Sequence, residues 1–222
     1  MLKMKINISD EVKTRIPCVA LGVINYIIKV EKSTPALLEY FEKTINEIEN
    51  KYEMGDIANM PHINEAREAY KALGKSPSQY RNAAEAMLRR IVKGNGLYKI
   101  NNVVEINNLI SVSSGYSIGS YDHAKLNGDI ELRRSPAGED YQGIGKAEVN
   151  IENLPVLYDA KGPFGNPTSD SRRAMIQNGE REVINFIYAF NQDKVDLEQW
   201  LEKYQEILRK YTNASNISVE IV

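Results

Sequence analysis

The chain has 222 residues, of which 28 are Lys or Arg and 30 are Asp or Glu, so its formal net charge is −2. This length suits one domain or two small ones, and a composition that is 42% hydrophobic and 26% charged is ordinary for a globular protein. Intrinsic disorder is excluded as the main state, because it requires few apolar residues and a large net charge. Cys18 is the only cysteine, which excludes a disulfide framework and favours a reducing compartment.

The sequence contains no candidate for a membrane span. Its longest apolar stretch, residues 19–28, is interrupted by Asn25, whereas a spanning helix needs about 20 apolar residues. No long apolar run follows the N-terminal lysines, so we expect no secretory signal, a cytoplasmic location and no membrane partner. The near-zero net charge also argues against general nucleic-acid binding, which usually requires a basic excess. A polyanion would have to meet a local basic patch.

The N-terminal part is predicted to form two strands and a helix. Residues 4–8 alternate apolar and polar side chains, and residues 19–30 are rich in Val, Ile and Tyr, so both are predicted strands. Thr34 can cap a helix that begins with Pro35. Apolar residues at spacings of three and four then continue as far as Ile48, which indicates one buried helix face.

Three further helices are predicted before residue 115. The first follows a loop at residues 60–62, is capped by Asn64 and ends at Gly74. The second begins at Ser76-Pro77 and ends at residues 94–96. The third is expected at about residues 102–114.

From residue 121 onward the pattern is mainly strand and turn. The expected features are a hairpin turn at Asn127-Gly128, an irregular loop at residues 161–168, a strand at residues 183–190, an amphipathic helix capped by Asp196 and a final strand at residues 217–222. No internal repeat or linker interrupts the chain. We therefore expect one domain, residues 1–222, of mixed α/β (α+β) class with a central β-sheet flanked by helices.

The sequence offers little for metal or nucleophilic catalysis. The histidines, His62 and His123, lie far apart and have no cysteine nearby, so no metal site and no cofactor is expected. Cys18 begins an apolar run and is expected to be a small buried hydrophobe. The Gly-x-Ser-x-Gly nucleophile motif and the glycine-rich phosphate-binding motifs are absent from the sequence.

Asn107, Asn108 and Ser111 lie close together within an otherwise apolar helix. Asparagine is a mediocre helix former, because its amide competes for backbone hydrogen bonds. Two explanations remain open for these residues. Their side chains face water or bond to nearby backbone, or they line a pocket that recognises a small polar ligand by hydrogen bonds.

Basic residues gather at three places in the chain. Arg89, Arg90 and Lys93 crowd one helix end, where cations complement the helix dipole. Two further pairs occur at residues 133–134 and 172–173. Solvated surface charge explains all three groups, and the alternative is contact with the phosphates of a nucleic acid.

A longer set of motifs, between about residues 64 and 134, carries a family resemblance. It comprises residues 67–74 (REAYKALG), 76–81 (SPSQYR), 84–90 (AEAMLRR), 100–108 (INNVVEINN), 119–122 (GSYD), 125–130 (KLNGDI) and 132–133 (LR). This set resembles the tRNA-binding and editing domain of the bacterial phenylalanyl-tRNA synthetase beta subunit, and more closely the free-standing proteins built from that domain alone. The resemblance implies a mixed α/β fold and a pocket that hydrolyses a wrongly attached amino acid from tRNA.

The resemblance also implies roles for individual residues. Asn107 and Asn108 stand where a Thr-Asn pair lines the pocket of the synthetase, which implies a catalytic role for both. The implied substrate contacts are Ser111, Gly119, Tyr121 and Asp122. Gly119 stands where the family has a histidine, and Asn185 or Ile187 stands where a glutamate reads the hydroxyl of tyrosine, so specificity for tyrosine is not carried over. The segments required for aminoacylation are absent, so we expect none.

Two functions remain open from the sequence. The first is trans-editing, in which Asn107 and Asn108 position water and substrate; an aminoacyl ester is activated, so positioning and oxyanion binding supply much of the acceleration. The second is a non-catalytic module that binds tRNA or a free amino acid. The expected partners are the acceptor end of tRNA, bound through Arg89, Arg90 and Lys93, and its aminoacyl group, with no DNA.

Overall fold

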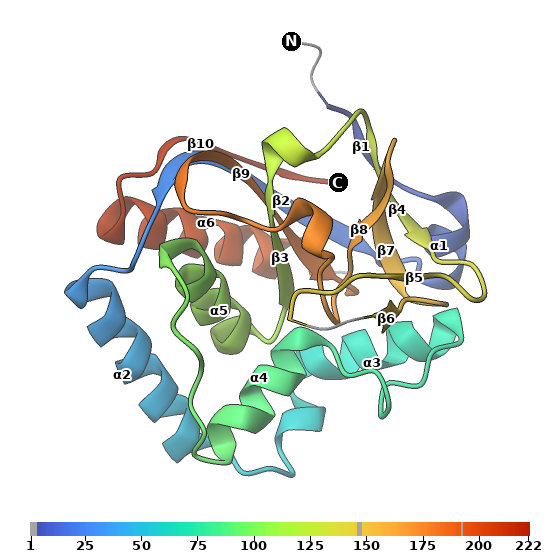
Figure 1. Ribbon diagram of the computed structural model, residues 1–222. Helices are drawn as coiled ribbons and strands as arrows, with labels where there is room; N and C mark the ends of the chain where they lie inside the picture. Colours follow the sequence, from blue (N-terminus) through green and yellow to red (C-terminus); the bar gives the residue numbers. More distant parts are fainter. Residues whose placement is uncertain (1–3, 146–147, 192) are drawn as a thin grey trace.

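The computed structural model describes residues 4–145, 148–191 and 193–222, and Figure 1 shows how they are arranged. The helices are α1 (Asp10–Arg15), α2 (Pro35–Lys51), α3 (Pro61–Leu73), α4 (Ala83–Val92), α5 (Asn102–Ser114) and α6 (Lys194–Tyr211). The strands are β1 (Ile6–Ile8), β2 (Ala20–Val30), β3 (Ser117–Asp122), β4 (Ile130–Arg134), β5 (Asp140–Tyr141), β6 (Val149–Asn150), β7 (Pro155–Asp159), β8 (Gly162–Gly165), β9 (Gly179–Ala189) and β10 (Ser215–Ile221).

The longest strands form an antiparallel four-stranded sheet in the order β10-β2-β9-β3. Strands β2 and β9 pair along their whole length, from Ala20 opposite Ala189 to Val30 opposite Gly179. Helices α2, α4, α5 and α6 lie together on one side of this sheet, and their apolar side chains join those of β2 in the larger core (Figure 1). The Val- and Ile-rich sequences of β2 and β9 suit strands that are buried on both faces.

A second four-stranded sheet, in the order β1-β4-β7-β8, packs on the other side. Strands β1 and β4 are parallel, with Ile6 opposite Ile130, and the remaining pairs are antiparallel. Here α1 and α3 contribute Val12 and Leu73 to a second core, which also includes Leu21 from β2. Strand β2 therefore belongs to both cores, and the mixed α/β class expected from the sequence is confirmed.

The helix starts follow local capping chemistry. The side chain of Thr34 accepts from the backbone three residues on, and Pro35 begins α2, as predicted. Helix α3 begins at Pro61 without the cap predicted at Asn64. Proline suits the first helical position because the N–H that it lacks would be unpaired there in any case. The loop predicted at residues 60–62 was therefore wrong.

Helix α4 also begins later than predicted from Ser76-Pro77. Asn82 is its cap: the side-chain oxygen accepts from the amide of Glu85 at 2.9 Å. An asparagine followed three residues later by a glutamate is a helix-start signal, and here it outcompetes the Ser-Pro pair. Residues 77–79 form a turn instead.

Two turn predictions were also wrong. Asn127-Gly128 does not join a hairpin, because β3 pairs with β9 whereas β4 pairs with β1 and β7. Residues 161–168 include the strand β8. Helix α5 has the predicted bounds and is buried on most of its surface. Within the described ranges, no helix is both long and apolar enough to span a membrane.

Candidate functional site

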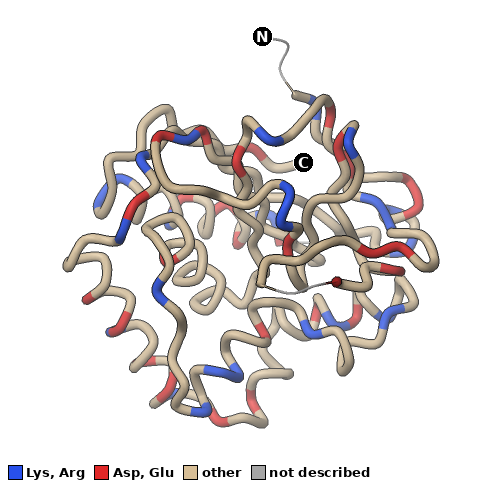
Figure 2. The backbone as a smooth tube through the Cα atoms, in the orientation of Figure 1, with Lys and Arg blue, Asp and Glu red and all other residues tan. Residues whose placement is uncertain are grey.

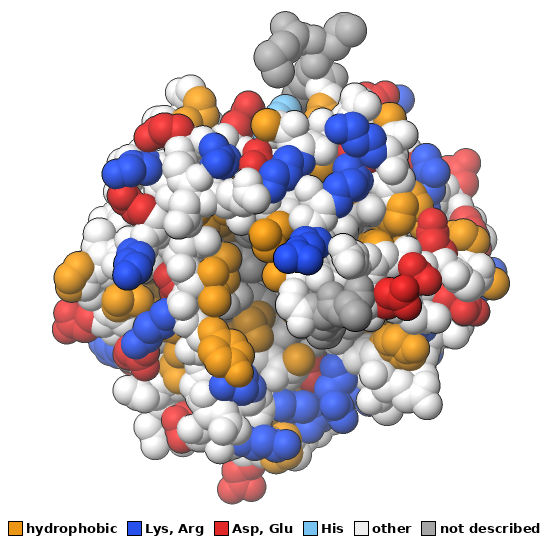
Figure 3. Space-filling view, viewed as in Figure 1, with side chains coloured by type: hydrophobic (Ala, Val, Ile, Leu, Met, Phe, Trp, Pro, Cys, Tyr) orange, Lys and Arg blue, Asp and Glu red, His pale blue; other side chains and the backbone are white. Residues whose placement is uncertain are grey.

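A groove with a volume of about 870 Å³ lies between α4, residues 79–81 and residues 148–150. Its cationic lining consists of Arg81, Arg89, Arg90 and Lys93. Figure 2 shows Lys and Arg residues gathered along α4, and Figure 3 shows basic side chains forming one area beside a hollow in the surface. The structure thus brings the three predicted RNA contacts together and adds Arg81.

Glu85 holds the arginines of this region from the inside. Its side chain is fully buried, and its carboxylate lies 2.9 Å from Arg89, 3.1 Å from Arg67 and 3.8 Å from Arg81. A buried carboxylate needs such partners, because an unpaired charge is costly to remove from water. The pairing fixes Arg89 in place, whereas Arg81 is half exposed and more loosely paired, and the carboxylate offsets part of the charge of both groove cations.

Arg90 and Lys93 supply the remaining positive charge of the groove. The guanidinium of Arg90 lies 4.3 Å from the centre of the Tyr98 ring, and its Nη2 donates to the carbonyl oxygen of Asn95 at 3.2 Å. The Nε of Arg90 is buried and has no hydrogen-bond partner among the described residues. An unpaired buried donor costs about 1–3 kcal/mol, and because this atom is covered by the protein itself, the groove is offered the terminal nitrogens of Arg90 instead.

A smaller hollow of about 300 Å³ adjoins the groove and shares Ala86 and Arg90 with it. Asn108 of α5 lines this hollow. The rest of its lining is apolar or aromatic: Met87, Leu97, Tyr98 and Ile100. Figure 3 shows hydrophobic side chains bordering the hollow next to the basic area. The volume lies at the lower end of the range for small-molecule sites.

Asn107 points away from this hollow and bonds to the edge of the sheet. Its Nδ2 donates to the carbonyl oxygen of Ile118 at 3.2 Å, and its Oδ1 accepts from the hydroxyl of Ser120 at 3.1 Å. Both partners belong to β3, so this amide ties α5 to the sheet. Each of the two explanations left open by the sequence therefore applies to one residue. Asn107 bonds to nearby backbone, and Asn108 lines a pocket.

Four predicted substrate contacts lie outside both hollows: Ser111, Gly119, Tyr121 and Asp122. The hydroxyl of Ser111 donates to the carbonyl oxygen of Tyr116 at 2.7 Å and closes the end of α5. The carboxylate of Asp122 pairs with Arg181 at 3.4 Å and caps the turn that follows β3. Both polar side chains are thus used within the fold.

Gly119 leaves room for the side chain of Tyr121. A Cβ atom at position 119 would lie 2.0 Å from the Tyr121 hydroxyl, and one at Gly165 would lie 1.9 Å from it. The ring therefore passes between two glycine backbones, with its edge against Phe164 at a centroid distance of 4.9 Å. A histidine at position 119 would overlap Tyr121. The position of the Tyr121 ring therefore requires the glycine that replaces the histidine of the family motif.

Asn185, one of the two residues at the position of the family's glutamate, is fully buried among tyrosines. Its Oδ1 accepts from the hydroxyl of Tyr26 at 3.4 Å, and its Nδ2 donates to the hydroxyl of Tyr204. Burial raises the pKa of both tyrosines. Ile187, the other residue, is buried in the core, and neither lines the hollow at Asn108.

Sequence reasoning missed Tyr98 and Ile100, which are 68% and 61% exposed at the rim of the hollow. The available signal was the interleaving of an aromatic residue with cations, from Arg90 through Tyr98 to Lys99. Aromatic side chains among basic residues are typical of surfaces that bind single-stranded nucleic acid.

His62 forms a separate polar cluster between α3 and α6. Its ring lies 2.9 Å from Glu65 and 3.0 Å from Asp196, and stacks on Tyr116 at a centroid distance of 3.8 Å. These contacts connect the two helices. Over residues 4–145, 148–191 and 193–222, no group of three His, Cys, Asp or Glu side chains is arranged to hold a metal ion.

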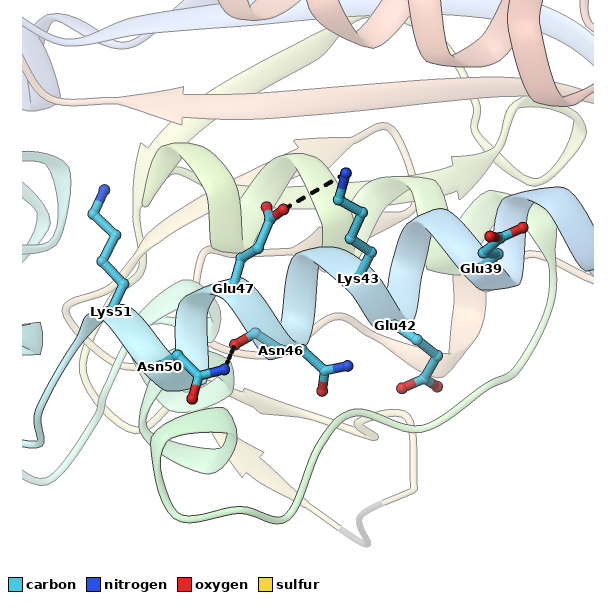
Figure 4. Close-up of a pocket in the computed structure, with 7 residues that line it drawn as sticks. All are labelled: Glu39, Glu42, Lys43, Asn46, Glu47, Asn50 and Lys51. Carbon is cyan, nitrogen blue, oxygen red and sulfur yellow. Dashed lines mark hydrogen bonds and ion pairs between the residues drawn. The ribbon is translucent and has the colours of Figure 1, made fainter.

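The outer face of α2 is also polar, and Figure 4 shows seven of its side chains. All come from one helix and carry both signs of charge, with Lys43 and Glu47 3.9 Å apart. Asn50 donates to the backbone oxygen of Asn46 at 2.7 Å. Exposed ion pairs of this kind contribute little energy, so this surface is a solvated helix face.

The fold and these hollows define a mixed α/β domain with a basic groove beside a small, partly apolar pocket. Comparison with protein families shows that residues 65–203, more than half of the chain, match the family described as the B3/4 domain. The chain belongs to this family, whose domain is of the phenylalanyl-tRNA synthetase beta-subunit type. The resemblance drawn from the motifs is thereby confirmed, and the protein is a tRNA-synthetase-related domain.

Among solved structures, the chain is similar to an N-terminal fragment of the phenylalanyl-tRNA synthetase beta subunit from Pyrococcus horikoshii. The sequence identity is 11% and the TM-score is 0.48. The match covers 99% of this chain and 50% of that chain, so this protein spans half the length of the fragment. No curated protein sequence matches the chain.

Proposed function

We propose that the protein binds the acceptor end of tRNA and hydrolyses the ester bond of a mischarged aminoacyl-tRNA. The observation that carries this proposal is the position of Arg90, which lines both the basic groove and the hollow that contains Asn108. An anionic backbone and a small group attached to its end would therefore be bound side by side. The membership of the B3/4 domain family supports tRNA as the nucleic acid.

The groove binds the phosphates in this proposal. Contacts from Lys and Arg to phosphates position a nucleic acid and carry no sequence information. Arg89 is anchored by Glu85, so it loses little side-chain entropy on binding. The overall charge of −2 then restricts the attraction to this patch and keeps binding brief.

Hydrolysis takes place in the hollow. Asn108 positions a water and donates a hydrogen bond from Nδ2 to the ester carbonyl oxygen as that oxygen becomes negative. The water oxygen bonds to the carbonyl carbon, the ester C–O bond breaks, and the departing oxygen takes a proton from that water and becomes a hydroxyl of the terminal ribose. The free amino acid then leaves. Asn107 acts as a positioning residue, because its bonds to β3 fix the helix that carries Asn108.

A second candidate function is binding without hydrolysis. It is favoured by the lining of the hollow, where Arg90 is the only charged side chain among the described residues and no carboxylate or histidine is present to act as a base. In that case the same groove and hollow would bind tRNA, or the hollow alone would bind a free amino acid.

We further infer that residues 1–222 act as one domain. The family match begins at residue 65, yet β2 and β10 lie outside it and complete the sheet that also contains β9 and β3. A fragment limited to the matched residues would expose the hydrogen-bonding edge of β9 that pairs with β2.

A deacylation assay tests the proposed function. The protein is incubated with a panel of mischarged tRNAs, and loss of the aminoacyl ester is measured over time. We expect hydrolysis of at least one member, and a decrease of about a hundredfold for Asn108→Ala, as for loss of an oxyanion donor. Asn50→Ala on the outer face of α2 is the matched control and should leave the rate unchanged. Ester loss no faster than in buffer, together with retained tRNA binding, would establish the binding function instead.

A further inference from the structure

The segment between α4 and α5, residues 93–101, forms one wall of the hollow. It has no helix or strand, yet it is fixed at several points. Asn95 accepts from Arg90, Lys99 pairs with Glu42 at 2.6 Å, and the amide of Ile100 donates to the buried carboxylate of Glu105. Its path is thus set by contacts on both sides of Tyr98.

Tyr98 is held outward by this arrangement. Its side chain is 68% exposed, although the segment that carries it is fixed. Arg90 stacks against its ring at 4.3 Å from the centroid and leaves the rest of the ring open to solvent. An aromatic plane backed by a guanidinium, next to a basic groove, has the features of a surface on which an unpaired base stacks.

We propose that Tyr98 is a stacking platform for the unpaired base at the 3′ end of tRNA, and that Arg90 orients this platform. This inference rests on the proposed function, because it names the part of tRNA that occupies the mouth of the hollow. With the base on Tyr98, the ester on the adjoining ribose lies at the entrance to the hollow lined by Asn108.

The charge of the neighbouring surface favours RNA over a peptide as the occupant. Four cations and one carboxylate, that of Glu148, line the adjoining groove, so its lining carries a net positive charge, and the fully buried carboxylate of Glu85 pairs with three arginines. An apolar peptide would gain little from these cations, whereas a nucleotide chain supplies a phosphate for them and a base for Tyr98.

The test uses tRNA whose 3′-terminal adenosine is replaced by the fluorescent base 2-aminopurine, which is quenched when it stacks. We expect the full-length protein to quench it on binding. Tyr98→Ala should remove the quenching and weaken binding about tenfold, within the range for loss of one base–aromatic stack. Tyr98→Phe and Tyr98→Trp should retain both effects, since they keep an aromatic plane. Val195→Ala is the control for loss of an exposed apolar side chain, since Val195 is 63% exposed on α6.

The outcomes separate this inference from the proposed function. Two results would overturn the platform. The first is that Tyr98→Ala weakens the binding of intact tRNA and of tRNA lacking its terminal nucleotide by the same factor. The second is that the 2-aminopurine fluorescence is still quenched by Tyr98→Ala. Deacylation by the wild-type protein would in both cases leave the proposed function standing. Absence of tRNA binding by the wild-type protein would overturn both.

Discussion

The hydroxyl of Tyr121 lies 2.5 Å from Oδ1 of Asp170 and donates a hydrogen bond to it. The same hydroxyl lies 3.2 Å from that of Tyr188 on β9. This contact connects the sheet with residues 166–171, a segment that places Thr168 in the wall of the basic groove. The position of that wall therefore depends on a carboxyl group surrounded by tyrosines.

The Asp170 carboxyl should make stability depend on pH. Burial raises its pKa from 3.8 to about 7, and the hydrogen bond from Tyr121 opposes this only in part. The folded protein thus binds the proton more tightly than the unfolded chain does. The stability contributed by this proton is fully present below about pH 4 and is lost as the pH rises through about 7. Asp170→Asn resembles the protonated form, so its Tm relative to wild type should increase from about pH 5 to about pH 8.

The control for this experiment is Asp140→Asn, which changes an exposed carboxyl on β5. It should show no increase over the same pH range. A Tm difference between Asp170→Asn and wild type that is constant with pH would contradict the assignment.

Gly119→Ala should destabilise the protein through overlap with Tyr121. The added methyl group would lie 2.0 Å from a hydroxyl that Gly165 confines on its other side. We expect a loss of about 1–3 kcal/mol in the free energy of unfolding, measured in urea. Gly55→Ala meets no atom within 4 Å and serves as the control. In the background Tyr121→Ala the cost of the added methyl group should disappear, and a cost that persists there would exclude this overlap as the cause.

Glu85→Gln should be strongly destabilising, although it preserves the shape of the side chain. The carboxylate is completely buried between Arg67 and Arg89, and its removal leaves these cations close together without a counter-charge. We expect a loss of about 3 kcal/mol from urea denaturation. Glu68→Gln breaks an exposed pair with Lys71 and should change stability by less than about 1 kcal/mol. Equal effects of the two substitutions would show that Glu85 does not hold the arginines.

Lys93 should contribute to tRNA binding through its charge alone. It is exposed at the end of α4 and lines the groove. Lys93→Ala should weaken binding to all tRNAs alike and lower the slope of log affinity against log salt by about 1. Lys43→Ala removes the same charge from the outer face of α2 and should leave the slope unchanged. An unchanged slope for Lys93→Ala would place the phosphates elsewhere.

The start of α2 and the extent of α5 were predictable from local patterns, whereas the starts of α3 and α4 and the long-range strand pairings were not. Helix α5 was predicted at its observed bounds, and the structure shows that its cap at Asn101 and the glycine at 115 act within a few residues. The parallel pairing of β1 with β4 joins residues about 120 positions apart, with Asn7 opposite Glu131, and no local pattern reveals it. Nor does periodicity reveal that residues 93–101 close a hollow over α4.

The two asparagines show the same limit at the site. Successive residues on a helix differ by about 100° in direction, so adjacent side chains must face different surroundings. The sequence could not say which of Asn107 and Asn108 meets the edge of β3, because that depends on how the helix is rotated against the sheet. The family motif identified the pair, and the structure separates their environments.

That separation predicts opposite signatures for the two substitutions. Asn107→Ala leaves the carbonyl oxygen of Ile118 and the hydroxyl of Ser120 without their partner, so it should reduce the free energy of unfolding by about 1–3 kcal/mol. Asn108→Ala removes a partly exposed amide and should change stability by less than about 0.5 kcal/mol while abolishing most of the deacylation rate. Urea denaturation and single-turnover deacylation of both variants check this. If Asn108→Ala loses stability and Asn107→Ala loses only rate, the assignment of the two residues is reversed, and the catalytic surface of α5 faces the sheet.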